Sequence, residues 1–190
     1  MKKLESTLLN MFVVLTVISL ISAAALAFTY AQTKPILDEQ ARQAQIQAVA
    51  RVLPEFDNAP TEEVFTADGF PGVELYPATS GGESVGIAVR TWSDAGYGGE
   101  IRLMVGFGPD GTITGTSVLS HAETPGLGAT MTEASFQEQF VGMNPGTEPL
   151  MVTKDGGSVD AITAATISSR AFCDAATRAY EAALAAGGIR

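Results

Sequence analysis

A hydroxyl-rich stretch near the C-terminus is the first place where this sequence could support chemistry. Residues 160–169 read Asp-Ala-Ile-Thr-Ala-Ala-Thr-Ile-Ser-Ser and run directly into a predicted helix. A phosphate is bound when backbone N–H groups can approach it closely, and Ala164 and Ala165 put little bulk in the way. A phosphoester on Thr166 would therefore place its negative charge in a favourable position.

The two serines at the end of this stretch support the same interpretation. Ser168 and Ser169 can provide an N-cap for the helix that follows, whose first N–H groups lack partners and whose dipole favours a nearby anion. The alternative is an ordinary N-capped helix after a polar turn, and for this string alone the alternative is favoured because short motifs often match by chance.

A second dense motif, His-Ala-Glu-Thr-Pro-Gly-Leu-Gly, occupies residues 121–128 and directly follows a predicted strand. As a simple turn, Pro125 and Gly126 would suit type II geometry, while Glu123 and Thr124 would be solvated. As a binding loop, its glycines would let backbone amides approach a planar ring, and Glu123 could accept hydrogen bonds from that ligand. Both interpretations stay open on these residues alone.

A third motif, Gly-Tyr-Gly-Gly at residues 96–99, precedes another predicted strand. A glycine turn that joins two strands is the ordinary explanation. The alternative is that Tyr97 packs near a bound aromatic group and that the glycines make room for it.

The elements that must position these motifs include a membrane segment. No charged residue occurs between Glu5 and Lys34, and residues 8–30 are dominated by Leu, Val, Ile, Ala and Phe. As a helix this stretch would span roughly 35 Å, enough for a hydrocarbon core of about 30 Å. A cleaved secretory signal is the alternative, since the start is basic and Ala-Leu-Ala at 25–27 resembles a cleavage site, but the apolar run is too long for one. We expect a retained membrane anchor. The numbers of basic residues on its two sides are nearly equal, so they do not decide which side of the membrane the following domain occupies.

Composition excludes several classes of protein. Residues 34–190 hold 9 basic and 20 acidic side chains, a net charge of −11, which disfavours binding to nucleic acid or anionic headgroups. The single cysteine, Cys173, rules out an intramolecular disulfide, and its place in a predicted helix suggests a small buried hydrophobe. With one histidine besides, a zinc, haem or iron–sulfur site is not expected.

Hydrophobic periodicity predicts an α+β fold with an antiparallel sheet and packed helices. The strands are expected over residues 85–89, 101–107 and 112–119, the last two as a hairpin, with a further short strand at 151–153. An amphipathic helix is expected over 35–53. A short helix is expected near 131–141, because Thr130 and Glu133 have capping-box spacing. A last helix is expected over 169–186, with Leu184 on its apolar stripe. Residues 54–82 are read as turns and short apolar runs.

In their order and spacing, the three motifs together resemble the FMN-binding domain of the G subunit of Rnf-type electron-transport complexes. They resemble more distantly the C subunit of the sodium-translocating NADH:quinone reductase. The resemblance covers the chain from Gly96 to the end of the last helix, together with the N-terminal membrane segment. It implies an N-terminal tail and transmembrane anchor at 1–33, an amphipathic connecting helix at 34–60 and one FMN-binding domain at 61–190.

The resemblance also implies a covalent FMN, attached by a phosphoester to Thr166, with no metal site and no catalytic residue in this chain. The implied cofactor-binding residues around Thr166 are Tyr97, His121, Glu123, Thr124, Gly126, Leu127, Gly128, Thr163, Ala164, Ala165, Ser168 and Ser169. One position departs from the family pattern, because Ala164 stands where a glycine is frequent. If the backbone there needs a positive φ, the alanine costs about 1 kcal/mol.

The function that the resemblance implies is electron relay within an ion-translocating ferredoxin:NAD+ oxidoreductase complex. A separate flavin transferase would install the FMN from FAD, other membrane subunits would be the partners, and the soluble domain would lie on the periplasmic side of the inner membrane. Two alternatives stay open: an FMN-binding subunit of another respiratory or Nqr-like reductase, or a flavin-free binding module tethered to the membrane.

Overall fold

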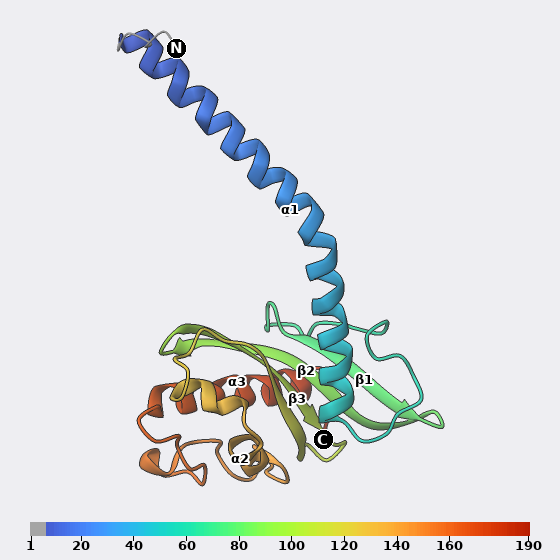
Figure 1. Cartoon of the computed structure of the whole chain (residues 1–190). Helices are drawn as coiled ribbons and strands as arrows, with labels where there is room; N and C mark the ends of the chain where they lie inside the picture. Colours follow the sequence, from blue (N-terminus) through green and yellow to red (C-terminus); the bar gives the residue numbers. More distant parts are fainter. Residues whose placement is uncertain (1–6) are drawn as a thin grey trace. The chain divides into compact units, whose positions relative to one another are not determined.

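The computed structural model describes residues 7–190 and divides them into two compact units, with the boundary between Gln43 and Ala44. The helices and strands are α1 (Leu8–Val52), β1 (Glu74–Ser80), β2 (Glu83–Gly96), β3 (Gly99–Phe107), β4 (Ile113–Ser120), η1 (Gly128–Thr132), α2 (Ala134–Gln137), η2 (Glu138–Phe140), η3 (Thr153–Asp155) and α3 (Thr166–Ala185) (Figure 1).

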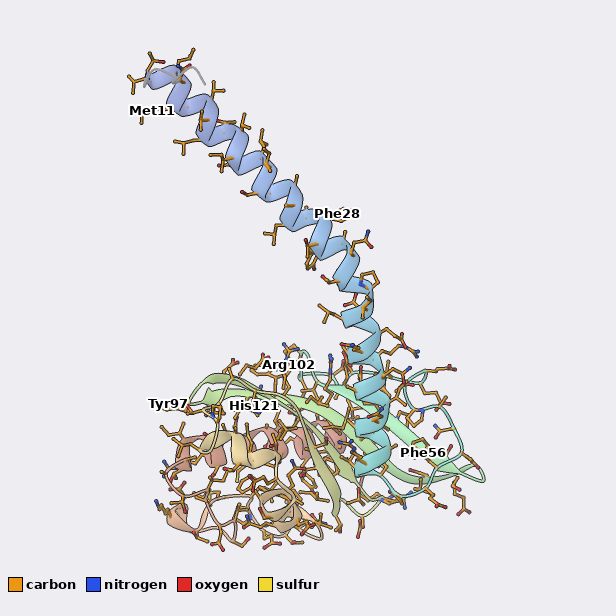
Figure 2. The ribbon with its side chains drawn as sticks, viewed as in Figure 1. Met11, Phe28, Phe56, Tyr97, Arg102 and His121 are labelled. Carbon is orange, nitrogen blue, oxygen red and sulfur yellow. The ribbon has the colours of Figure 1, made fainter. Side chains whose placement is uncertain are left out.

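Within the described residues, α1 is the one helix long and apolar enough to cross a membrane. The large apolar side chains of its N-terminal half, among them Met11 and Phe28, are exposed (Figure 2), as expected for a helix whose partner is lipid. Charged side chains begin at Lys34, which pairs with Asp38 at 2.9 Å. The helix continues through Pro35 without a break, and the expected domain boundaries at 33 and 60 stay predictions.

The second unit is built on a four-stranded antiparallel sheet with the order β1-β2-β3-β4. The expected hairpin is confirmed: β3 and β4 are joined by a turn in which the Gly111 N–H donates to the Gly108 carbonyl at 3.0 Å. Strand β1 was missed, because Pro77 and the short apolar runs around it are typical of turns. An edge strand tolerates this proline, since the outer side of β1 needs no complete ladder.

One face of the sheet is covered by the last turns of α1. Val49 and Val52 are buried there against Tyr76 and Met104. The Thr114 hydroxyl also donates to the Val52 carbonyl. The expected apolar stripe over 35–53 is thus only partly right, because its first positions, Ile36, Ala41 and Ala44, are exposed.

The other face of the sheet is covered by α3, which packs on β2 and β3 through a row of small residues. The alanines of this row are Ala171, Ala175, Ala176, Ala179, Ala182 and Ala183. Phe172 extends the core toward α2 and η2, with ring centroids 5.2 Å from Phe136 and 4.7 Å from Phe140. Leu184, expected on this apolar stripe, is 49% exposed, so its assignment was wrong.

The segment between β4 and α3 differs most from the prediction. The continuous helix expected near 131–141 is broken into η1, α2 and η2, and Glu133 is an extended residue with no side-chain capping bond. The Thr130 hydroxyl donates instead to the Leu127 carbonyl, so the capping box was wrong. Residues 151–153 form no strand; Val152 makes a single parallel bridge with Val159.

Candidate functional site

A pocket of about 470 Å³ collects residues from all three sequence motifs. It lies where the β2–β3 turn, the loop after β4 and the start of α3 meet. Its lining consists of Tyr97, Glu123, Thr124, Leu127, Gly128, Ala164, Ala165, Thr166, Ile167 and Ser168. A volume of this size is in the usual range for a cofactor site.

Glu123 holds the three motifs together. One carboxylate oxygen accepts from the Gly98 N–H at 3.0 Å, and the other accepts from the Ser168 hydroxyl at 2.9 Å. Because Glu123 is 5% exposed, the alternative of a solvated side chain is wrong. A buried carboxylate is stable only when hydrogen-bonded, and these two donors, from different segments, fix the walls of the pocket.

Two glycines allow this close approach. A Cβ on Gly98 would lie 2.1 Å from the Ala122 carbonyl oxygen, so the β2–β3 turn contacts the loop after β4 directly. A Cβ on Gly128 would lie 2.4 Å from both the Glu123 carboxylate and the Ser168 hydroxyl. Both contacts are shorter than any real Cβ tolerates, so a glycine is needed at each position.

His121 and Tyr97 lie at this same end of the sheet (Figure 2). His121 does not line the pocket; its Nδ1 accepts from the Glu123 N–H at 3.1 Å, which orders the backbone that carries Glu123. Tyr97 lies in the β2–β3 turn, is 73% exposed and lines the pocket rim. The turn explanation for residues 96–99 is therefore correct, and the aromatic ring still faces the site.

The backbone before Thr166 has an unusual conformation. Ala164 has φ of +59°, and it is the one non-glycine residue in the described part of the chain with a positive φ. This left-handed conformation costs an alanine about 1 kcal/mol. The backbone at position 164, where the family often has glycine, therefore does adopt the positive φ that glycine accommodates best.

Helix α3 begins at Thr166, three residues earlier than expected. Ala165 is the N-cap and makes no side-chain bond, so the assignment of Ser168 and Ser169 as the N-cap was wrong. The Ser169 hydroxyl accepts from the Ile162 N–H at 3.0 Å and donates to the Ala165 carbonyl at 3.1 Å, which fixes the loop.

The first turn of α3 has backbone N–H groups without acceptors. In the described structure the N–H groups of Thr166, Ile167 and Ser168 donate to no protein acceptor. Such groups at the first turn of a long helix bind anions.

Four predicted residues lie outside this pocket, and two of them line a second hollow. Thr163 and Gly126 line a separate hollow of about 400 Å³. The Gln139 amide oxygen braces this side, because it accepts from the Asp160 N–H at 2.8 Å. Thr163, Gly126, His121 and Ser169 are thus neighbours of the pocket rather than part of its lining.

Two residues of the site were missed by the sequence prediction. Ile167, 48% exposed, adds an apolar side chain to the rim, and it was missed because the motif was read from its hydroxyl-bearing and small residues. Lys154 lies on η3, and its Nζ donates to the Thr166 hydroxyl at 3.4 Å. It is the only lysine in residues 35–190, which is the one feature that could have drawn attention to it.

Cys173, a residue of α3, is buried as expected, and this burial raises the pKa of its thiol to about 12. A thiol so poorly ionised is unsuited to redox chemistry. Within residues 7–190 there is also no group of three His, Cys, Asp or Glu side chains that could hold a metal ion.

The residues of the pocket fit a flavin nucleotide. Tyr97, Leu127 and Ile167 give apolar surface suited to a planar ring. The free N–H groups at the start of α3 and the Lys154 ammonium suit a phosphate. Apolar surface and anion-binding donors therefore meet in one pocket.

Comparison with known proteins agrees with this chemistry. Residues 96–181 match the family model described as an FMN-binding domain. The chain is 42% identical over 171 residues to the G subunit of the ion-translocating oxidoreductase complex of Methanosarcina acetivorans, a match that covers 87% of this chain and 89% of that protein. It is 36% identical over 172 residues to the G subunit of the Na(+)-translocating ferredoxin:NAD(+) oxidoreductase complex of Acetobacterium woodii, a match that covers 83% of each.

Among solved structures, the NqrC protein of Shewanella oneidensis superposes with a TM-score of 0.49 at 20% identity, over 65% of this chain and 67% of that chain. The two sequence relatives are more similar and extend over most of both chains. The chain therefore belongs to the family of G subunits of Rnf-type ion-translocating oxidoreductase complexes.

Proposed function

We propose that this protein is a membrane-anchored electron carrier whose FMN is attached covalently to Thr166 through a phosphoester. The observation that supports this most is the placement of Thr166. It is the first residue of the 20-residue helix α3, its hydroxyl contacts Lys154, and it lines the pocket that unites the three motifs.

The residues around Thr166 have distinct roles in this proposal. The linked phosphate keeps one negative charge, which the free N–H groups of the first turn of α3 stabilise. Tyr97, Leu127 and Ile167 contact the ring, while Glu123 positions the two loops and does not react. The bound flavin supplies the redox chemistry, and this chain supplies its orientation and electrostatic environment.

Attachment requires a second enzyme and a flavin donor. A flavin transferase would direct the Thr166 oxygen to the phosphorus on the riboflavin side of FAD. An oxygen–phosphorus bond forms, the bond from that phosphorus to the bridging oxygen breaks, AMP leaves, and the hydroxyl proton passes to a base of the transferase. The product carries one FMN less one water.

The biological setting follows from the family. The Acetobacterium woodii relative is named as part of a Na(+)-translocating ferredoxin:NAD(+) oxidoreductase complex, and we propose that this chain relays electrons in a complex of that type. Helix α1 would anchor it in the inner membrane beside the other subunits, with the FMN-binding domain on the periplasmic side. The acidic domain would lower the potential of the flavin, because nearby negative charge disfavours its anionic reduced form.

Intact-mass analysis of the full chain produced together with a flavin transferase tests the proposal. The parent chain should gain the mass of one FMN less one water, and Thr166→Val should gain nothing. Thr163→Val is the matched control, because this exposed hydroxyl lies three residues away and outside the pocket, and it should be modified like the parent. A parent chain without added mass, or a modified Thr166→Val chain, contradicts the proposal.

A further inference from the structure

Lys154 is the one lysine of the soluble unit, and its surroundings set it apart from the other cations. Its Nζ lies 3.4 Å from the Thr166 hydroxyl and makes no ion pair in the described structure. An ammonium without an ion pair is unexpected among residues 34–190, which hold 20 acidic and 9 basic side chains and where most cations have carboxylate partners. Lys154 therefore makes no direct ion pair, although it attracts the carboxylate of its neighbour Asp155.

The neighbouring charges explain why Lys154 makes no ion pair. The adjacent carboxylate, Asp155, accepts two hydrogen bonds from Arg170, both at 2.7 Å. Arg170 holds the pKa of Asp155 below its usual value, so the carboxylate is ionised and fully engaged. Both Asp155 oxygens are thus hydrogen-bonded to Arg170, and Lys154 interacts with this carboxylate only through space.

The same ion pair positions Lys154. Arg170 lies one helical turn after Thr166, so the Asp155–Arg170 pair ties η3 to the first turn of α3. On its other side η3 is tied by the Thr153 N–H, which donates to the Val159 carbonyl at 2.8 Å. Lys154 is therefore carried on a segment fixed at both ends, directly against Thr166.

We propose that Lys154 is a phosphate-binding and positioning residue for the flavin on Thr166. This inference rests on the proposed attachment and adds a residue to it. Once Thr166 is esterified, its oxygen is a weaker acceptor, and the ammonium shifts to an anionic phosphoryl oxygen on the same phosphorus. A charge-assisted hydrogen bond of this kind is stronger than the neutral one it replaces.

Lysine reactivity in the full chain tests this contact directly. Samples with and without FMN on Thr166 are treated with an amine-acetylating reagent, and the rate at each lysine is followed by peptide mass spectrometry. Lys154 should react about threefold to tenfold more slowly in the flavin-loaded chain, as expected for a partly exposed charge pair. Lys34 in α1 is the internal control and should react equally in both samples.

Variants give a second measurement with a different readout. Lys154→Gln should reduce the rate of FMN attachment by about threefold to tenfold, Lys154→Arg should keep most of it, and added salt should shrink the difference. Because Lys154 is exposed, both variants should fold, and the circular dichroism spectrum checks this.

The outcomes separate the two proposals. An unmodified parent chain overturns both the attachment and the contact. A loaded chain in which Lys154 reacts as fast as in the unloaded chain leaves the attachment standing and overturns the role of Lys154.

Discussion

The two ends of α3 are stabilised by different chemistry. Its last half presents Ala175, Ala176 and Ala179 to the sheet, all fully buried and without a polar side chain among them. Its first turn buries Ser168, which donates to the Glu123 carboxylate, and Ser169, which bonds to the backbone of the preceding loop. Both ends are tightly packed, but only the first depends on a polar network, which is costly to bury unless every member is satisfied.

The difference indicates which end is shaped for stability and which for a ligand. Alanine packing gives close contact between helix and sheet with little loss of side-chain entropy. The polar end instead leaves three N–H groups without acceptors and holds Ala164 in a left-handed conformation. Such departures from local preference are expected at functional sites.

The largest effect is expected at Glu123, where the polar network is centred. Glu123→Ala leaves the Gly98 N–H and the buried Ser168 hydroxyl without an acceptor, and should lower the free energy of unfolding by about 2–4 kcal/mol. Flavin attachment should fall as well, because the pocket walls separate. Urea unfolding of the full chain in detergent, followed by circular dichroism, measures the first effect, and intact mass measures the second.

Glu123→Gln is the matched control, since the amide keeps an acceptor for Gly98 and Ser168 can reorient to accept from it. Glu123→Gln should lower the free energy of unfolding by less than half as much as Glu123→Ala, and it should change the absorption spectrum of the bound flavin. Equal losses for the two variants would show that the network is not the source of the stability.

At the alanine-packed part of α3 we expect a smaller loss of stability and no loss of flavin attachment. Ala179→Leu should overpack the contact between α3 and the sheet and lower the free energy of unfolding by about 1–3 kcal/mol. Flavin attachment to the folded chain should be unchanged. Ala185→Leu, at an exposed position on the same helix, should leave both quantities unaltered. A loss of attachment in Ala179→Leu would mean that the two ends are coupled.

The smallest effect is expected at Ala164. Replacing it with glycine relieves the left-handed conformation but gives the unfolded chain more freedom, so stability should rise by up to about 1 kcal/mol. Ala161→Gly, a substitution nearby without a positive φ, should instead destabilise the chain slightly. Thermal unfolding of the two variants beside the parent measures the difference. A destabilised Ala164→Gly chain would show that the conformation carries no strain.

The sequence predicted elements with regular periodicity and missed those set by tertiary contacts. Strand β2 alternates, β3 and β4 are two runs separated by a Gly-Pro-Asp-Gly turn, and α3 has a strong apolar stripe, so all four were predicted. Strand β1 contains Pro77 and is stabilised by its pairing with β2. The segment from η1 to η2 folds around Phe136 and Phe140, whose burial overrides the local capping signal.

In the candidate site, too, the sequence predicted local features and missed long-range contacts. The motifs identified Thr166 and most of the lining, because small and hydroxyl-bearing residues cluster in the sequence. Nothing local indicated that Glu123 is buried or that Lys154 reaches Thr166, since each contact joins residues far apart in the chain. Ser168 and Ser169 were predicted as an N-cap, but their bonds go to loops rather than to a helix cap.

The most direct test of the account is the identity of the modified residue. Trypsin cleaves after Lys154 and Arg170 and releases a peptide of residues 155–170, which contains Ser158, Thr163, Thr166, Ser168 and Ser169. Tandem mass spectrometry of this peptide, from full chain produced with the transferase, can assign the added mass to one hydroxyl. The account predicts FMN less one water on Thr166 alone. The same mass on Thr163 or on a serine, or a peptide without added mass, would contradict it.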